Sequence, residues 1–133
     1  MTTFFFSMND ADCSSGCRWQ ICPQRYLSEL RKRDGLRNIL TLFGERSCLS
    51  PAQGRVPRTG DLIILYAKDL QDLEAMIDAG DIFDGLKKIL VVADPAGVDD
   101  RKYHMLAPRY ITHAGRNIAE LEAVIRKMKK YVH

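Results

Sequence analysis

Three short segments of the chain are centred on runs of consecutive apolar residues. They are residues 2–7, 61–67 and 88–93. Strands that are apolar on both sides are typical of a parallel sheet covered by helices on its two faces. We therefore expect these segments, with a shorter strand at 108–112, to form the centre of such a sheet.

The remainder of the first half has a less regular pattern. Pro23 suits the first turn of a helix, and apolar residues continue at helical spacing as far as Phe43. Asp34 and Gly35 can break this helical stretch in two. Three turn-forming residues within 47–60 leave room there for one short irregular strand at most.

The second half predicts its helices more clearly. Apolar spacing indicates a helix over residues 70–80 and a short one over 99–106. The last helix is expected at 117–132, where Asn117 and Glu120 have the spacing of a capping box. An apolar stripe follows these two residues. Basic residues lie near the C-terminal end of the helix, where their charge interacts favourably with the helix dipole.

The alternation of strands and helices predicts the fold class. It implies parallel strands joined by right-handed crossovers. We expect residues 1–133 to form one α/β domain, a three-layer sandwich with a central, mostly parallel five-stranded sheet of the flavodoxin-like kind. No segment approaches the roughly 20 apolar residues of a membrane span. No export signal is recognised at the start of the sequence, so we expect a cytoplasmic protein with reduced cysteines.

Charge is segregated along the sequence although the net charge is only +3. Residues 18–58 contain nine Lys or Arg and three Asp or Glu, whereas 59–100 contain three and ten, and 101–133 contain eight and two. A basic surface can attract nucleic acid or an acidic protein. Because no nucleic-acid motif or interleaved aromatic residues accompany these charges, solvated helix faces are favoured over nucleic-acid binding.

The second half of the sequence resembles the receiver domains of bacterial two-component response regulators. Those domains have a strand of the form D-L-I-L-L-D, a later strand ending in Thr or Ser, and Y-L-x-K-P before the last helix. The counterparts here are residues 61–66, 89–94 and 110–114. The resemblance covers residues 61–133, and the first half fits only in outline.

The resemblance also aligns the residues that bind phosphate in receivers with residues of different chemistry. The phospho-accepting Asp corresponds to Tyr66, the Thr or Ser that binds the phosphoryl group to Ala93, and the bridging Lys to His113. Phosphoryl transfer of this kind needs a carboxylate nucleophile. The resemblance therefore implies a pseudo-receiver, a non-enzymatic regulatory domain that contacts other proteins independently of phosphorylation.

The magnesium site of receivers also lacks clear counterparts. Its acidic pair corresponds to Ser7 and Met8, with Asn9, Asp10 and Asp12 as displaced candidates for a residual acidic loop. Mg²⁺ requires several oxygen ligands in a nearly octahedral arrangement. We therefore expect neither a resident metal nor a cofactor.

Four cysteines form a second group of candidate residues. Cys13, Cys17 and Cys22 are spaced C-x3-C-x4-C, and Cys48 follows later. Four thiolates can hold zinc or an iron–sulfur cluster. This spacing matches neither the usual C-x2-C pairs nor the common ferredoxin pattern, so ordinary reduced cysteines are favoured, while metal binding and redox sensing remain alternatives.

Residues 7–18 suggest a different class of function. The interval from Cys13 to Arg18 resembles the phosphate loop of low-molecular-weight phosphatases and arsenate reductases but is one residue short. Ser14–Gly16 lie where flavodoxins cradle a flavin phosphate. A small enzyme or cofactor-binding protein that uses this loop is the alternative hypothesis.

The expected partner is a regulatory protein that the sequence does not identify. Receiver-like domains often pair through their fourth helix, fifth strand and last helix, which correspond here to residues 99–132. The resemblance therefore implies a homodimer. The opposite charges of 59–100 and 101–133 add a contribution that salt would screen.

Overall fold

The computed structural model describes residues 2–8, 23–33, 36–45, 48–51, 58–67, 70–78, 80–92, 103–113 and 117–130. Its strands are β1 (Thr3–Met8), β2 (Leu40–Glu45), β3 (Cys48–Pro51), β4 (Leu62–Ala67), β5 (Lys87–Val92) and β6 (Tyr110–His113). Its helices are α1 (Pro23–Arg31), α2 (Leu70–Asp78), the 3₁₀ helix η3 (Gly80–Phe83) and α4 (Ile118–Lys130).

All the strands of the described residues belong to one sheet, in the order β3-β2-β1-β4-β5-β6. β1 pairs in parallel with β2 and β4, and β5 pairs in parallel with β4 and β6. β3 is the exception, because it pairs with β2 in the antiparallel direction. The predicted α/β class with a mostly parallel sheet is confirmed, and this part of the chain has six strands where five were expected.

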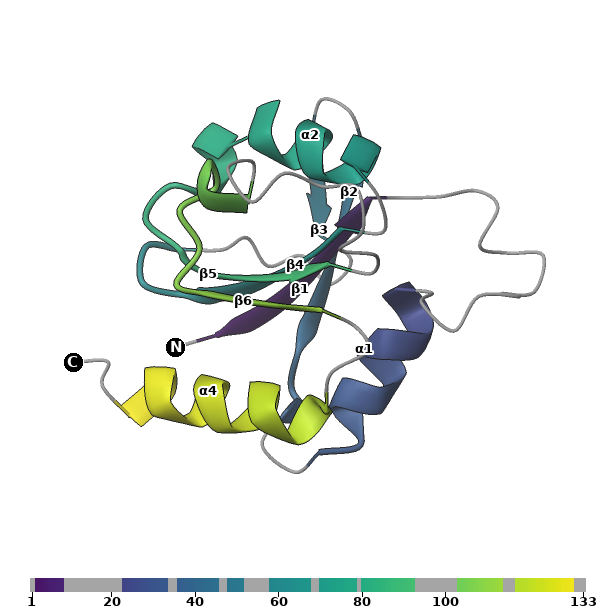
Figure 1. Cartoon of the computed structure of the whole chain (residues 1–133), viewed down its shortest axis with the longest axis vertical. Coiled ribbons are helices and arrows are strands. Elements are labelled where there is room, and N and C mark those ends of the chain that lie inside the picture. Colours follow the sequence, from purple (N-terminus) through teal and green to yellow (C-terminus); the bar gives the residue numbers. More distant parts are fainter. Residues whose placement is uncertain are drawn as a thin grey trace.

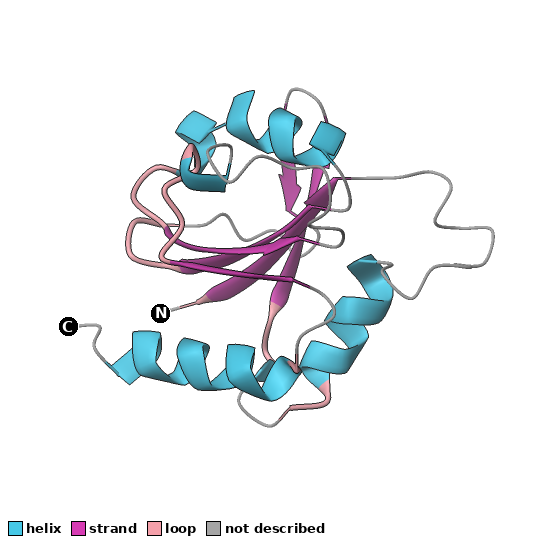
Figure 2. Ribbon diagram, in the orientation of Figure 1, coloured by secondary structure: helices cyan, strands magenta, loops and turns pink. Residues whose placement is uncertain are grey.

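Helices cover both faces of the sheet (Figure 1). α1 and α4 lie on one face, and their apolar side chains pack with those of β1, β4 and β5. α2 and η3 lie on the other face and pack against the alternate residues of the same strands. β4 is buried along its whole length because it lies between the two layers (Figure 2). We call these two coverings the α1–α4 layer and the α2–η3 layer.

The prediction of helical structure as far as Phe43 is wrong from residue 40 onward. Residues 40–45 form β2, which pairs with β1 from Phe4↔Leu40 to Met8↔Gly44. A short run with apolar residues three and four apart fits a helix and a strand alike, and pairing with a buried neighbour decides between them. The preceding turn is fixed by the Arg31 side chain, which donates to the carbonyl oxygen of Ile39 at 2.9 Å.

The short strand that was expected at most within residues 47–60 is β3. Glu45 pairs with Cys48, so β2 and β3 form a tight antiparallel hairpin. The strand lies at the edge of the sheet, where a proline at its end is tolerated. β3 therefore covers the open side of β2.

The amino edge of the sheet is tied together by Asp61. Its carboxylate accepts hydrogen bonds from the backbone N–H of Thr2 at 3.1 Å and of Arg58 at 2.9 Å. Gly60, with a φ of +93°, donates its N–H to the carbonyl of Gly85 at 2.9 Å. These bonds fix the starts of β1, β4 and β5 relative to one another. Because the three strands are parallel, their ends lie together at the opposite edge of the sheet.

Candidate functional site

The candidate site lies at the carboxyl edge, where open α/β sheets usually bind ligands. The pairing register places Ser7, Tyr66, Val91 and Thr112 in one row across four strands near this edge. Paired residues of parallel strands point to the same face of a sheet. This row therefore faces the α1–α4 layer.

Tyr66 is fully buried at the end of β4. Its ring centroid lies 5.1 Å from that of Tyr26 on α1 and 5.8 Å from that of Phe5 on β1. The Phe5 and Tyr26 rings are 6.3 Å apart, so the three rings form one cluster. Tilted rings at these distances stabilise one another beyond the area they bury. The end of β4 on this face is occupied by aromatic packing.

Tyr26 is a buried tyrosine whose pKa is altered by its surroundings. Burial raises the pKa of the Tyr26 phenol well above its ordinary value, and the nearby Tyr110 phenol raises it further. Burial disfavours the charged phenolate because the protein interior solvates charge poorly. Tyr26 therefore stays protonated beyond the pH at which an exposed tyrosine ionises.

Tyr66 and His113 lie on opposite faces of the sheet. Tyr66 pairs with Val91, which packs in the α1–α4 cluster, whereas His113 pairs with Val92, which packs in the α2–η3 cluster. Thr112 is the β6 residue that shares the row of Tyr66. Ala93, the third residue of the predicted acceptor pocket, lies outside the described residues.

Most of the other candidate residues also lie outside the described residues. These are the acidic-loop candidates Asn9, Asp10 and Asp12 and the cysteines Cys13, Cys17 and Cys22. Cys48 is described, and it begins the edge strand β3 opposite Glu45. Within the described ranges, no group of three or more His, Cys, Asp or Glu residues could hold a metal ion.

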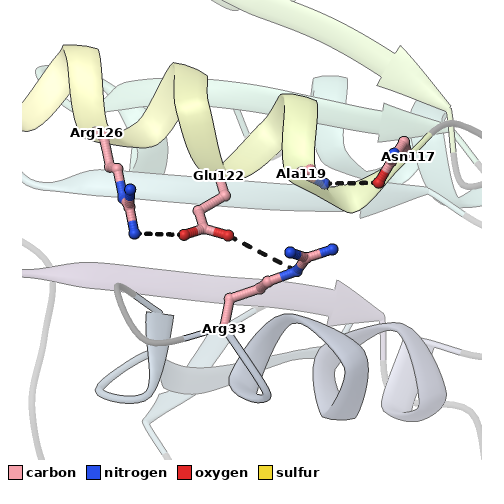
Figure 3. Close-up of polar contacts among 5 residues, drawn as sticks. All are labelled: Arg33, Asn117, Ala119, Glu122 and Arg126. Carbon is pink, nitrogen blue, oxygen red and sulfur yellow. Dashed lines mark hydrogen bonds and ion pairs between the residues drawn. The ribbon is translucent and has the colours of Figure 1, made fainter.

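Glu122 is a buried charged residue that the sequence did not single out. Its two carboxylate oxygens contact Arg126 at 2.6 Å and Arg33 at 3.7 Å (Figure 3). The Glu122 side chain is 12% exposed, against 43% for Arg33 and 64% for Arg126. The i,i+4 spacing of Glu122 and Arg126 was visible in the sequence. The contact with Arg33 was not, because it joins the end of α1 to the middle of α4.

Comparisons of the chain with protein-family models, curated proteins and solved structures found no match. None of the helices in the described part of the chain has the length and apolar character needed to cross a membrane. The inference of function therefore depends on the geometry of the chain's own residues.

Proposed function

We propose that this chain is a regulatory protein-interaction domain, a receiver-like module that works without phosphorylation. The observation that carries the proposal is the aromatic cluster at the end of β4. Tyr66 stands where the resemblance places the phospho-accepting Asp, and its ring packs on Phe5 and Tyr26 with no exposed surface. A protonated phenol in such packing cannot replace a carboxylate nucleophile.

The strand order supports a flavodoxin-like fold of three layers. With β3 set aside, the parallel strands follow the order β2-β1-β4-β5-β6. Numbered along the chain, this is 2-1-3-4-5, the flavodoxin-like order. One feature departs from receivers, since the described residues between β2 and β4 include the antiparallel strand β3 and no helix.

The position of His113 also favours an interaction module over a phosphate-binding site. A phosphoryl group bound beside Tyr66 would need its cationic partner on the same face of the sheet. His113 is in register with Val92 and belongs to the other face. The proposed module is cytoplasmic and acts on a regulatory protein partner, as the resemblance to two-component signalling proteins implies.

The homodimer through residues 99–132 remains part of this proposal. The described part of that surface contains β6 and α4. β6 ends the order of strands in the sheet, so its outer edge has no strand partner within the described ranges. Such an edge is a ready template for contact with another chain.

Incubation with acetyl phosphate and Mg²⁺, followed by intact-protein mass spectrometry, tests the loss of the acceptor. We expect no added phosphoryl mass, whereas an active receiver treated in parallel gains one. Asp69, three residues beyond Tyr66, is the nearest following carboxylate in the sequence and lies outside the described residues. An added mass that disappears in Asp69→Asn would contradict the proposal by showing a displaced acceptor.

The absorbance spectrum of the purified protein tests the alternative class. A flavin or iron–sulfur band would favour a cofactor-binding protein that uses residues 7–18. A spectrum with only aromatic absorbance is expected for the interaction module.

A further inference from the structure

The two helical layers have opposite net charges. Residues 70–86, which form the α2–η3 layer and its following turn, contain five Asp or Glu and no Lys or Arg. Residues 23–33 and 117–130, which contain α1 and α4, hold eight Lys or Arg and three Asp or Glu. These layers cover opposite faces of the sheet (Figure 1). The helical segments on one face therefore have a negative net charge and those on the other face a positive one.

Each layer has exposed charged side chains among the described residues. On the α1–α4 layer, Lys127 is exposed, and Lys32 is 70% exposed although it also forms an ion pair with Glu29 at 2.9 Å. On the α2–η3 side, Asp78 ends α2, Asp84 follows η3, and both are exposed. Glu122 holds two further cations of the basic face in fixed positions, so that face presents an ordered set of charges.

We infer that the basic α1–α4 layer of one copy docks on the acidic α2–η3 layer of a second copy. The inference rests on the proposed interaction role of the domain and names the chain itself as a partner. The two surfaces are complementary in sign, and each covers one face of the same sheet. Attraction between them brings two copies together in a defined orientation.

This contact differs in symmetry from a dimer through residues 99–132. A two-fold dimer places the same surface patch on both sides of the contact. Docking of the α1–α4 layer on the α2–η3 layer is instead head-to-tail, and it leaves one unoccupied basic face and one unoccupied acidic face. Further copies can add to these faces, so the assembly grows with concentration instead of stopping at a dimer.

Sedimentation velocity of the full chain, measured over a range of concentrations and salt, tests the inference. We expect the weight-average mass to rise at least about twofold in low salt and to fall to the monomer mass at about 0.3 M NaCl, where screening acts over a few ångström. The acidic-face variant Asp78→Lys/Asp84→Lys and the basic-face variant Lys32→Glu/Lys127→Glu should each lose the growth in mass with concentration in low salt and reach at most the mass of the dimer through residues 99–132. Thermal melts of both variants establish that they are folded.

Mixing the two variants gives the decisive result. The acidic-face variant keeps its basic layer, and the basic-face variant keeps its acidic layer, so the mixture should regain the growth in mass that neither variant shows alone. Arg58→Glu is the matched control, since it reverses an exposed charge on the loop before β4 and lies on neither layer and outside residues 99–132. We expect it to leave the wild-type association unchanged.

Other outcomes overturn the inference in distinguishable ways. A wild-type chain that is monomeric in low salt at all concentrations excludes both head-to-tail docking and the homodimer through residues 99–132, and it leaves the proposed interaction with a regulatory partner standing. A dimer that only Arg109→Glu dissociates would assign the contact to residues 99–132. Binding of duplex DNA that Lys32→Glu/Lys127→Glu abolishes, without self-association, would assign the basic layer to nucleic acid.

Discussion

The two helical layers stabilise one sheet by different means. On the α1–α4 side, two tyrosines and a glutamate lie in or beside the core, namely Tyr26 of α1, Tyr66 of β4 and Glu122 of α4. The α2–η3 layer packs through the apolar side chains Leu73, Met76 and Phe83, and one buried phenol, Tyr103, joins the same cluster. Stability on the α1–α4 side should therefore respond to charge and pH in ways that the apolar contacts of the other side do not.

The largest effect is expected from Tyr66→Asp. This change removes a ring from the cluster with Phe5 and Tyr26 and places a carboxyl group in a fully buried position. The free energy of unfolding should fall by about 3–5 kcal/mol, the range seen when a large buried side chain is lost. Urea denaturation measures the change, and Tyr66→Phe, which keeps the ring, should cost about 1 kcal/mol.

A loss below about 1 kcal/mol in Tyr66→Asp would contradict the close packing around Tyr66, because it would mean that water reaches the new carboxylate.

Phe83→Ala gives the comparison on the other layer. The Phe83 ring meets that of Phe6 edge-on, with centroids 5.1 Å apart. Its loss should also cost about 3–5 kcal/mol, with no dependence on the ionisation of a new group.

A smaller effect is expected from Glu122→Ala. The change leaves Arg33 and Arg126 without their shared carboxylate, but both guanidinium groups remain partly exposed and can be hydrated. We expect a loss of about 1–2 kcal/mol in unfolding free energy, smaller in high salt. Glu120→Gln is the matched control. It removes an exposed charge from the same helix, keeps a side chain suited to the capping box with Asn117, and should cost at most about 0.5 kcal/mol. Equal losses in the two variants would show that the link between α1 and α4 contributes nothing.

The smallest effect concerns Tyr26 and appears only in alkaline solution. Above pH about 10 the phenol of the unfolded chain loses its proton, whereas the folded chain keeps it because burial has raised its pKa. The unfolded state is then favoured, so stability present at neutral pH declines as the pH rises. Tyr26→Phe should reduce this decline, as measured by denaturation at pH 8 to 11.

Tyr110→Phe removes only the secondary influence on Tyr26 and should retain most of the alkaline decline. An unchanged decline in Tyr26→Phe would show that other tyrosines determine it. Comparing Tyr26→Phe with Tyr110→Phe therefore separates the effect of the buried Tyr26 phenol on alkaline stability from that of the half-buried Tyr110 phenol on the same face.

The elements predicted well from the sequence are those whose burial follows directly from local pattern. β4 and β5 are apolar on both faces because both layers cover them, and that requirement is visible in residues 61–67 and 88–93. The start of α4 is equally local, since the Asn117 side chain accepts a hydrogen bond from the N–H of Ala119 at 3.0 Å.

The features that the sequence did not predict depend on contacts between distant segments. β2 has the apolar spacing of a helix, and only its pairing with β1 makes it a strand. The separation of Tyr66 from His113 required the register of β6, which a strand prediction one residue out of place would reverse. The contact between Glu122 and Arg33 likewise arises only when α1 and α4 lie together.

The position of β1 in the middle of the sheet has a consequence for how the chain folds. β1 is the earliest strand in the sequence, yet its backbone groups bond β4, and Thr2 bonds Asp61, 59 residues away. A nascent chain must therefore hold its first apolar strand unpaired on that side until residue 67 has left the ribosome. Pairings between such distant segments slow folding relative to helical bundles of the same size. The three consecutive phenylalanines of β1 are accordingly the segment most in need of protection during synthesis.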